Sequence, residues 1–334
     1  MKSLTITFPA PRTVELREEA VGDPGPGQVL LRTSVSLIST GTEGMCYRGD
    51  FDPDSFWGVQ YPHTPGYSNV GQVIKVGRDV ERYQEGDRIF NVSSHRQYAI
   101  VDVDHPKIAR LPESTPDEDA AWSWLAVVTQ TGVRRSEQAM GETAAVIGLG
   151  PLGQFTVQYL RLIGLREVMA IDPIQHRLDL ALAHGATSSY CGSAADAVGF
   201  VEELTDDQRA DVVYDVTGND QVFSMAQRLA KSLGTVALIG DAPHPSRQRL
   251  THDVIRRQLR IVGTQNDLLP SQHAGWCAAE QIPLYYLYLQ RGQMRVCDLV
   301  SHRFSPEEAR EAYTMLEENR GETMGVVFCW RSQE

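Results

Sequence analysis

Three glycines and an aspartate near the middle of the chain have the types and the spacing of a dinucleotide-binding turn. Gly148, Gly150 and Gly153 follow the pattern G-x-G-x-x-G, and Asp172 lies nineteen residues after the last of them. The first glycine permits a tight turn, the second lets a pyrophosphate approach the backbone, and the third lets a helix pack closely. An aspartate at this distance can accept hydrogen bonds from both ribose hydroxyls. The four residues therefore predict a site for a dinucleotide cofactor.

The segments around these residues predict the elements that would position them. Residues 144–147 form a short apolar run, as expected for a buried parallel strand. Residues 154–163 have apolar side chains mostly on one side of a helix, and residues 167–171 form a second apolar strand ending at Asp172. The helix would direct its N–H groups and the positive end of its dipole at the phosphates. Pro151 and Leu152, within the turn, are predicted to line the cofactor with the glycines.

The charge of Asp172 predicts which cofactor is bound. A carboxylate beside the adenosine ribose repels a 2′-phosphate, so NAD is favoured over NADP. Arg177 lies just beyond it and is the residue that would reverse this preference by binding the phosphate.

Other candidate cofactor contacts follow the later strands of the same region. Apolar strands are predicted over residues 210–215, 234–240 and 260–263. In an open parallel sheet the ligand lies outside the carboxyl ends of the strands. The residues at these ends that we predict to contact the cofactor are Thr217, Gly218, Gly240, Asp241 and Thr264.

The composition of the chain limits the classes of protein to which it can belong. Its 334 residues suggest about two domains, and 42% hydrophobic with 22% charged residues is ordinary for a soluble globular protein. A net charge of −12 argues against nucleic acid or an anionic membrane as a partner. The N-terminal residues contain no apolar signal segment, and the longest apolar stretch, residues 120–133, is too short to span a bilayer. We therefore expect a cytoplasmic protein.

The distribution of strand and helix patterns predicts an α/β chain with two different parts. Short strands with glycine, proline and aspartate turns fill the first third and suggest a small β-barrel. From about residue 140 to residue 265, strands and helices alternate, as in a doubly wound parallel sheet. A long helix is predicted over residues 117–135, and a later one over residues 283–291.

Four stretches, taken in their order and spacing, resemble the medium-chain dehydrogenase/reductase (alcohol dehydrogenase) superfamily over nearly the whole chain. The resemblance implies a GroES-like barrel domain at residues 1–120 and 269–334, and a Rossmann dinucleotide-binding domain at residues 121–268. It also implies a homodimer formed through the sheet edge near residues 259–265. The stretches are PGPGQVLLRTSVSLIS, GYSNVGQVIKVGRDVERYQEGDRIF, AVIGLGPLG with the following AID, and RGQMRVCDLVSHRFSPEEAREAYTML.

The positions at which this family holds its catalytic zinc carry other residues here. In zinc-dependent members the ligands are a cysteine in a C-G-T-D-like turn, a histidine in a G-H-E turn, and a cysteine or acid before the Rossmann strand. Thr40, Tyr67 and Ser123 occupy these positions. Hydroxyl groups are poor zinc ligands beside thiolate or imidazole. The four-cysteine lobe that holds structural zinc is also missing, because the five cysteines are scattered without any C-x-x-C. No zinc is expected.

The turn at residues 38–43, together with Pro65-Gly66-Tyr67, is similar to a zinc-free branch of the family. That branch includes the bacteriochlorophyllide dehydrogenases, which oxidise a secondary hydroxyl beside a large ring. The resemblance covers only a few residues, so it does not carry a substrate over to this chain.

Without zinc, hydrogen-bond donors must polarise the substrate oxygen. Thr42 stands at the proton-relay position of the family, and Tyr67 could act as a general acid if a nearby cation lowered its pKa. His95 is the candidate whose ordinary pKa is nearest the working pH. Each has a structural alternative: Thr42 as a turn cap, Tyr67 as a packing residue and His95 as a hydrogen-bonded core residue. Trp57 and Trp122 are candidate walls of a substrate pocket.

Three functions are compatible with these features. The leading one is a zinc-independent, NAD-dependent dehydrogenase of a secondary alcohol or its ketone, for which a cyclic or polyhydroxylated substrate is expected. The second is an NADPH-dependent ene or quinone reductase on the same scaffold. The third is a nucleotide-binding protein without catalysis.

Overall fold

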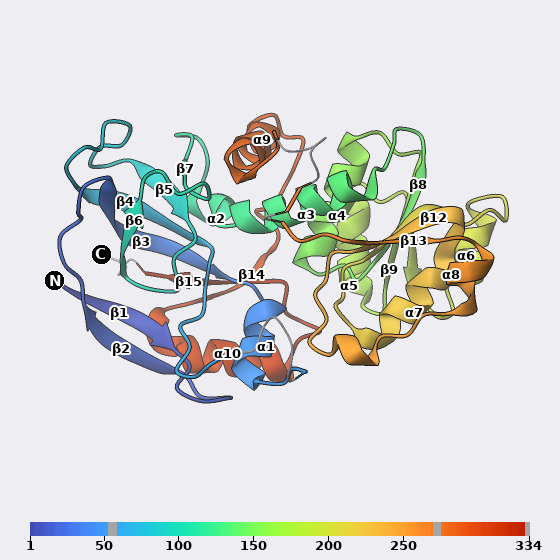
Figure 1. Ribbon diagram of the computed structural model, residues 1–334, viewed down its shortest axis with the longest axis horizontal. Helices are drawn as coiled ribbons and strands as arrows, with labels where there is room; N and C mark the ends of the chain where they lie inside the picture. Colours follow the sequence, from blue (N-terminus) through green and yellow to red (C-terminus); the bar gives the residue numbers. More distant parts are fainter. Residues whose placement is uncertain (53–58, 267, 270–274, 331–334) are drawn as a thin grey trace. The chain divides into compact units, whose positions relative to one another are not determined.

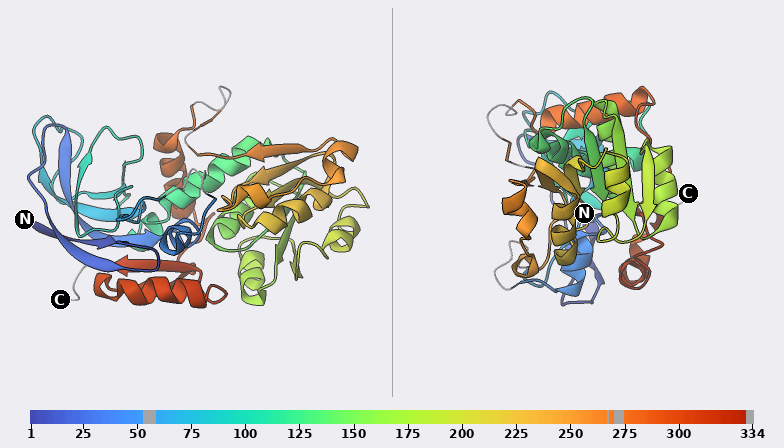
Figure 2. Two further views of the ribbon diagram at one scale, coloured as in Figure 1. Left: turned by 60° about the horizontal axis from the view of Figure 1, so that its bottom comes forward. Right: turned by 90° about the vertical axis from the view of Figure 1, so that its right-hand side faces the viewer.

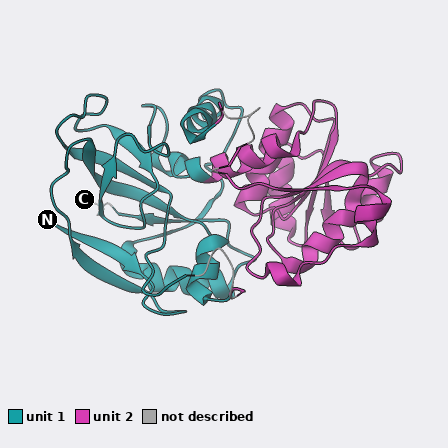
Figure 3. Cartoon of the chain, viewed as in Figure 1, with its two compact units in different colours: residues 1–50, 57–124, 277–334 teal, residues 51–56, 125–276 magenta. Residues whose placement is uncertain are grey.

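The computed structural model describes residues 1–52, 59–266, 268–269 and 275–330. Strands and helices follow one another as drawn in Figure 1, with two further views in Figure 2. The chain divides into two units: unit 1 is residues 1–50, 57–124 and 277–334, and unit 2 is residues 51–56 and 125–276 (Figure 3).

The unit boundaries differ in detail from the predicted domain boundaries. The first division follows Trp124, inside a helix, rather than residue 120. The second precedes Cys277, eight residues later than the predicted start of the returning segment at residue 269. A short segment that includes Phe51 and Asp52 belongs to unit 2, which the sequence did not suggest. The backbone N–H of Asp52 donates to the carbonyl oxygen of Pro243 at 2.9 Å, which explains the assignment.

Unit 1 is built on a seven-stranded sheet and a separate two-stranded hairpin of β1 and β2. The long strand β3 is central, because β15, β4 and β6 all pair with it antiparallel. Val29 and Leu31 of β3 pack with Val73 and Ile89 in a buried cluster inside the sheet. The strands are β1 (Lys2–Thr7), β2 (Glu15–Ala20), β3 (Gln28–Ile38), β4 (Asn69–Val76), β5 (Arg88–Asn91), β6 (Tyr98–Asp102), β7 (Ala109–Arg110), β14 (Val300–Phe304) and β15 (Gly325–Cys329).

The helix predicted over residues 117–135 is two helices. It breaks at Ala121 and Trp122, where the buried indole packs so closely on Gly325 that a Cβ there would lie 2.5 Å from the ring. The helices attached to unit 1 are α1 (Thr42–Arg48), α2 (Asp117–Ala120), α9 (Ala278–Gln290), α10 (Ala309–Glu318) and the 3₁₀ turn η3 (Pro306–Glu308), and α3 (Ser123–Ser136) continues into unit 2.

The helix predicted to begin at Pro283 begins earlier, at Ala278, so Pro283 lies inside α9. A proline in a helix interior costs about 3 kcal/mol. Burial of one large side chain contributes about 1.5–3 kcal/mol. The buried side chains of Ile282, Tyr285 and Tyr286 therefore outweigh the lost backbone hydrogen bond.

Unit 2 has a six-stranded parallel sheet in the order β10-β9-β8-β11-β12-β13. The chain starts at β8, moves outward through β9 and β10, and returns to β11 on the other side. The strand order therefore reverses between β8 and β11, which is where doubly wound folds bind their ligands. The strands are β8 (Thr143–Ile147), β9 (Glu167–Asp172), β10 (Ser188–Cys191), β11 (Ala210–Asp215), β12 (Ala230–Leu238) and β13 (Arg260–Gly263).

Helices lie against both faces of this sheet, as the end-on view of Figure 2 shows. Apolar side chains of β8, β9, β11 and β12 form one buried cluster with residues of α6 and α7. In the part of the chain that the structure describes, no helix is long and apolar enough to cross a membrane. The helices are α4 (Pro151–Leu162), α5 (Gln175–Ala183), α6 (Val198–Glu203), α7 (Asp220–Leu229), α8 (His252–Arg256) and the 3₁₀ turn η1 (Pro245–Arg247).

Candidate functional site

The glycine turn of unit 2 connects β8 to α4 at the reversal of strand order. Gly148 has a φ of +90°, which glycine adopts without strain, and a Cβ there would lie 2.6 Å from the Thr217 methyl. A Cβ on Gly153 would lie 2.0 Å from the Gly148 carbonyl oxygen, so this glycine is needed for helix and turn to meet. A Cβ on Gly150 would have no protein atom within 4 Å. The surface above Gly150 is therefore open to a ligand.

The N-terminus of α4 adjoins this open surface. Gly150 is the N-cap and has no side chain to cap the helix, and Pro151 occupies the first turn. Pro151 and Leu152 are both half-buried. A twelve-residue helix with an uncapped start directs unpaired N–H groups and a positive dipole end at whatever lies above it. An anionic group such as a pyrophosphate fits this position.

Asp172 ends β9 and holds the glycine turn. Its carboxylate accepts the backbone N–H of Leu149 at 2.7 Å and that of Ile174 at 2.9 Å, and the residue is 3% exposed. A carboxylate has about four lone-pair sites, so two backbone bonds leave capacity for hydroxyl donors. Arg177 approaches it with 4.0 Å between Nη1 and Oδ2. Burial lowers the pKa of Arg177, and the charge of Asp172 opposes this.

Gln154 is a residue of this site that the sequence analysis missed. Its side chain is fully buried, and Nε2 donates to the carbonyl oxygens of Leu149 at 3.0 Å and Arg177 at 2.8 Å. Its Oε1 is paired with His184 Nδ1 at 3.0 Å. The backbone of Leu149 is thus held on both sides, its N–H by Asp172 and its carbonyl oxygen by Gln154. The signal that could have revealed it is a polar residue directly after Gly153 in an otherwise apolar helix.

The predicted residues that follow β11 and β12 lie side by side. Gly218 has a φ of +63°, and a Cβ on it would lie 2.3 Å from the Asp241 carbonyl oxygen. A Cβ on Gly240 would lie 2.3 Å from the Gly218 nitrogen, so the two turns require glycine at both positions. Thr217 donates from its hydroxyl to Asp215 at 2.7 Å. With Gly148 packed on Thr217, the three turns converge at one end of the sheet.

Two further predicted contacts differ in their availability. Asp241 is exposed. Thr264 is 8% exposed, and its hydroxyl donates to the carbonyl oxygen of Leu238 at 2.7 Å. The Thr264 side chain therefore fastens the loop after β13 to β12, which leaves its backbone rather than its hydroxyl for a ligand.

In unit 1, Thr42 and Tyr67 form a cluster of hydroxyl groups with Ser39. The hydroxyl groups of Ser39 and Thr42 lie near the phenol of Tyr67 and act to lower its pKa. Both Thr42 and Tyr67 are partly exposed. Burial raises the pKa of Tyr67, the two hydroxyls oppose this, and the charge of Glu43 adds to it. The shift is opposite in direction to the one that a nearby cation would cause.

His95 cannot contact a substrate directly, which corrects its prediction as a catalytic candidate. The residue has no exposed surface, and both ring nitrogens are engaged. Nδ1 lies 2.7 Å from Ser36 Oγ, and Nε2 lies 2.9 Å from Glu43 Oε2. The alternative, a hydrogen-bonded core histidine, describes it correctly.

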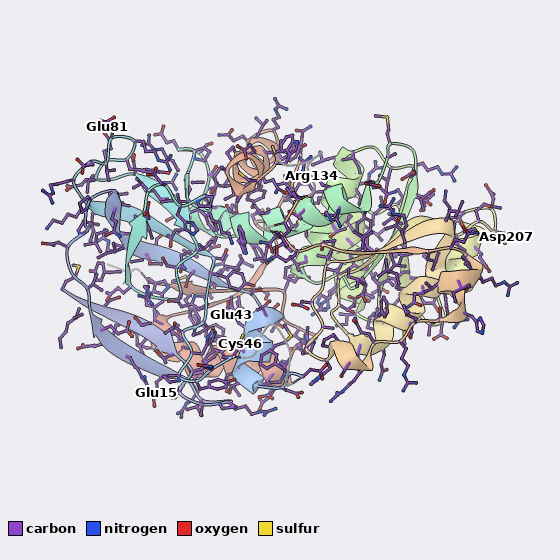
Figure 4. All side chains as sticks on the ribbon, viewed as in Figure 1. Glu15, Glu43, Cys46, Glu81, Arg134 and Asp207 are labelled. Carbon is purple, nitrogen blue, oxygen red and sulfur yellow. The ribbon has the colours of Figure 1, made fainter. Side chains whose placement is uncertain are left out.

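Glu43, which is labelled in Figure 4, joins His95 to two further residues of unit 1. Its Oε1 accepts the backbone N–H of Ser39 at 2.8 Å, and its Oε2 accepts the hydroxyl of Tyr313 at 2.6 Å as well as contacting His95. The residue is 1% exposed. Tyr313 lies 270 residues further along the chain, so no local pattern could have identified the pair.

The three positions of the family's zinc ligands carry hydroxyl side chains. Thr40 is half-buried and Tyr67 belongs to the hydroxyl cluster. Ser123 is fully buried, donates to the carbonyl oxygen of Ala120 at 2.6 Å, and pairs with the hydroxyl of Tyr286 at 3.0 Å. Among the described residues, no group of three histidine, cysteine or acidic side chains could hold a metal ion. The donor set does not fit zinc.

Neither tryptophan can be placed at a substrate pocket. Trp122 has no exposed surface and fills the core against Gly325, so the prediction that it walls a pocket is corrected. Trp57 lies outside the described residues.

Two family models match this chain, one in each predicted domain. The alcohol dehydrogenase GroES-like domain matches residues 25–106, and the zinc-binding dehydrogenase model matches residues 151–267. The second match begins after all three zinc-ligand positions, Thr40, Tyr67 and Ser123, so its name carries no information about them.

Curated relatives align over most of the chain at low identity. D-guloside 3-dehydrogenase from Escherichia coli (strain K12) is 25% identical over an alignment of 352 residues. The alignment covers 98% of this chain and 100% of the relative. An alcohol dehydrogenase from Rhizobium meliloti (strain 1021) is 28% identical over 334 residues, covering 86% of this chain and 94% of the relative.

Solved structures share the fold. One is a zinc-binding-type dehydrogenase from Sinorhizobium meliloti 1021 solved with NADP, which superimposes with a TM-score of 0.81. Its sequence is 21% identical, and the match covers 98% of this chain and 99% of that one.

Proposed function

The chain belongs to the medium-chain dehydrogenase/reductase superfamily, and we propose that it is a zinc-independent, NAD-dependent enzyme that interconverts a secondary alcohol and its ketone. The chain is an oxidoreductase of that superfamily. The observation that carries the proposal is the hydroxyl cluster of Ser39, Thr42 and Tyr67, in which Tyr67 occupies a position where zinc-dependent members of the family have a metal ligand. The substrate that we favour is a cyclic or polyhydroxylated alcohol, because one relative is a dehydrogenase of a guloside.

The glycine turn of unit 2 fits a nicotinamide dinucleotide. Its pyrophosphate would lie on the open surface of Gly150 at the start of α4, and its adenosine ribose beside Asp172. The chemistry that such a cofactor supplies is reversible hydride acceptance by the nicotinamide ring. Gln154 and Asp172 keep the Leu149 peptide fixed before the ligand arrives, which reduces the conformational entropy lost on binding.

The choice of NAD over NADP depends on one carboxylate and one guanidinium. Asp172 is bound by two backbone N–H groups, which stabilise its charge at the ribose position. A 2′-phosphate would be repelled by that charge, and Arg177 at 4.0 Å partly compensates it. These contacts support NAD. Solved structures of this fold contain NADP in one case and NADH in another.

Tyr67 and Thr42 are the groups that we propose to handle the hydroxyl proton. A neutral phenol donates a hydrogen bond to a ketone oxygen and stabilises the negative charge that develops there during hydride delivery. In the oxidative direction the phenol oxygen accepts the alcohol proton while the phenol passes its own proton to a neighbouring hydroxyl, and that hydroxyl releases its hydrogen to solvent. Ser39 and the partly exposed Thr42 are the hydroxyls beside it.

Zinc independence is tested by metal analysis and chelation. By mass spectrometry, the purified protein should contain less than about one zinc per ten chains, because hydroxyl groups bind zinc poorly. Turnover should be unchanged after dialysis against a chelator. Activity that disappears on chelation and returns with zinc alone would show that the proposal is wrong.

Replacement of the phenol tests its role in catalysis. Tyr67→Phe should lower kcat by about 100-fold while the Kd of NAD stays within twofold, because a removed oxyanion donor costs about 10²–10³ in kcat. Tyr98→Phe, on β6, is the matched control and should retain full kcat. An unchanged kcat for Tyr67→Phe would make Tyr67 a packing residue.

A second candidate function is an NADPH-dependent ene or quinone reductase, which the position of Arg177 favours. Titration of NADH and NADPH against the same protein separates the two, since a preference for NADPH of tenfold or more, about 1.4 kcal/mol, would support the second candidate. Cofactor binding without turnover of any alcohol, ketone or enone would instead support a non-catalytic nucleotide-binding protein.

The proposed partner, besides a small-molecule substrate, is a second copy of the chain. β13 is the outermost strand of the six-stranded sheet, so its outer backbone groups are available for pairing. Sedimentation at micromolar concentration should give twice the mass of one chain, and a monomer would contradict this.

A further inference from the structure

We propose that Glu43 and His95 form a buried positioning pair that holds the hydroxyls of Thr42 and Tyr67 in register for proton transfer. The inference rests on the proposed function. Glu43, His95 and Tyr313 are buried and cannot contact a substrate, so their role is to position the residues that do.

His95 connects the two turns that carry the hydroxyls. Its backbone N–H donates to the carbonyl oxygen of Pro65 at 2.8 Å. Gly66, with a φ of +100°, packs so closely that a Cβ would lie 2.8 Å from the imidazole ring. The imidazole therefore sets the position of the turn whose next residue is Tyr67. Its Nε2 contacts Glu43, the residue that follows Thr42.

Glu43 fixes the other turn. Its Oε1 accepts the N–H of Ser39, so the carboxylate closes the loop from the end of β3 to the start of α1. Ser39 and Thr42 lie at the two ends of this loop, between β3 and α1. A shift of the carboxylate would move both residues together.

The hydrogen bonds of the network agree with one arrangement of protons. Glu43 Oε2 accepts the hydroxyl hydrogen of Tyr313 and, as a carboxylate oxygen, also accepts from Nε2 of His95. Ser36 Oγ accepts the indole N–H of Trp330 at 2.8 Å and keeps one hydrogen, which it can donate to Nδ1 of His95. Every bond has one donor and one acceptor, as a stable buried network requires.

This network positions rather than conducts. It ends at the indole N–H of Trp330, which can donate but cannot accept a hydrogen bond. At the other end, Glu43 is bonded to the backbone N–H of Ser39, and a peptide N–H does not pass its proton on. A proton from Tyr67 therefore has no continuous path through these bonds, and the role of the pair is geometric.

Two tyrosines of one aromatic cluster provide the test. The rings of Tyr313 and Tyr47 stack with centroids 5.7 Å apart, and both residues are buried. The Tyr313 hydroxyl binds Glu43, whereas the Tyr47 hydroxyl faces the carbonyl oxygen of Arg12 at 3.4 Å. Tyr313→Phe therefore removes one oxygen from the network, and Tyr47→Phe removes one oxygen from the same cluster outside it.

Two measurements are made on both variants. Hydrogen exchange followed by mass spectrometry should show faster exchange of the backbone amides of residues 39–45 in Tyr313→Phe and not in Tyr47→Phe. Steady-state kinetics should show kcat about tenfold lower in Tyr313→Phe, with the Kd of NAD unchanged, since small misplacements of catalytic groups cost up to about 100-fold. Tyr47→Phe should keep kcat within about twofold.

The outcomes separate this inference from the proposed function. Unchanged exchange in Tyr313→Phe overturns the inference, because the network then does not hold the turn. Faster exchange with an unchanged kcat also overturns it, because the turn is then held without effect on the reaction. Equal losses of kcat in both variants point to general loosening of the aromatic cluster and overturn it as well. Absence of turnover in the unmodified enzyme contradicts the proposed function itself, and the exchange result still reports whether the network holds the turn.

Discussion

The glycine turn of unit 2 and the hydroxyl cluster of unit 1 are held in place by different means. In the turn, the absence of side chains permits close approach: a Cβ on Gly153 would lie 2.0 Å from a backbone oxygen. In the cluster, side chains from distant parts of the chain provide the geometry, with Glu43 joined to Tyr313 and His95. The turn should therefore be damaged by added atoms and the cluster by removed ones.

The largest effect is expected from an added carbon in the turn. Gly153→Ala should weaken NAD binding by about 100-fold, or ~2.7 kcal/mol, because the turn must move away from the new methyl group. Calorimetric titration measures the affinity. Gly199→Ala, on α6, is the matched control, since a Cβ there meets nothing within 4 Å. Wild-type affinity in Gly153→Ala would show that the turn is not rigid and would remove the contrast with the cluster.

A smaller effect is expected when the added carbon enters the space left for the ligand. A Cβ on Gly150 has no protein neighbour, and its φ of −66° suits any residue, so Gly150→Ala should keep its Tm. It should nevertheless weaken NAD binding by about tenfold, because the pyrophosphate lies against this backbone. Thermal unfolding with and without NAD measures both quantities. A lower Tm in the free protein, or an unchanged shift with NAD, would disprove the position assigned to the pyrophosphate.

The smallest expected effect is a difference in the rate of alkylation between two thiols in different surroundings. Burial, with the charge of Glu43, raises the pKa of Cys46 from 9.0 to about 12. A raised pKa keeps the thiol protonated at pH 8, with about a thousandfold less thiolate than an ordinary cysteine. The exposed Cys191 in unit 2 should therefore react with iodoacetamide first, as peptide mapping would show. Equal labelling in the folded protein would mean that α1 opens readily.

The sign of the pH dependence follows from the same pKa. Because the folded state holds the Cys46 proton more tightly than the unfolded chain, this group stabilises the fold below pH 9. Its contribution is lost as the pH rises through 9 toward 12. Urea unfolding at pH 8 and pH 10 should show a smaller free energy of unfolding at pH 10, and Cys46→Ser should reduce the difference.

How much of the molecule could be predicted depends on whether the cause is local. The GroES-like and Rossmann folds were predicted correctly, and the glycines of the turn lie where their spacing placed them. These features arise from neighbouring residues. His95 was misjudged because a histidine in a loop reveals nothing about a glutamate fifty-two residues earlier that binds it. Trp122 was misjudged for the same reason, since its partner Gly325 belongs to a distant strand.

The helix boundaries show the same limit in the fold. The predicted helix begins at Pro283, and proline is over-represented at the first position of helices. The structure places it inside α9, where the buried Tyr285 donates its hydroxyl to the carbonyl oxygen of Asp119 at 2.7 Å. That contact with α2 is tertiary, so local propensity could not reveal it. The strand β10 was missed because its four residues, Ser188–Cys191, are mostly polar and half-buried.

The division of the chain between its units has a consequence for handling the protein in the laboratory. Unit 1 is assembled from three separate stretches and unit 2 from two, with Phe51 and Asp52 grouped in unit 2. Cloning a continuous fragment cannot yield either unit whole: a piece ending at Trp124 lacks α10, and with it Tyr313. A circularly permuted gene, or co-expression of complementary pieces, would be needed to study one half without the other.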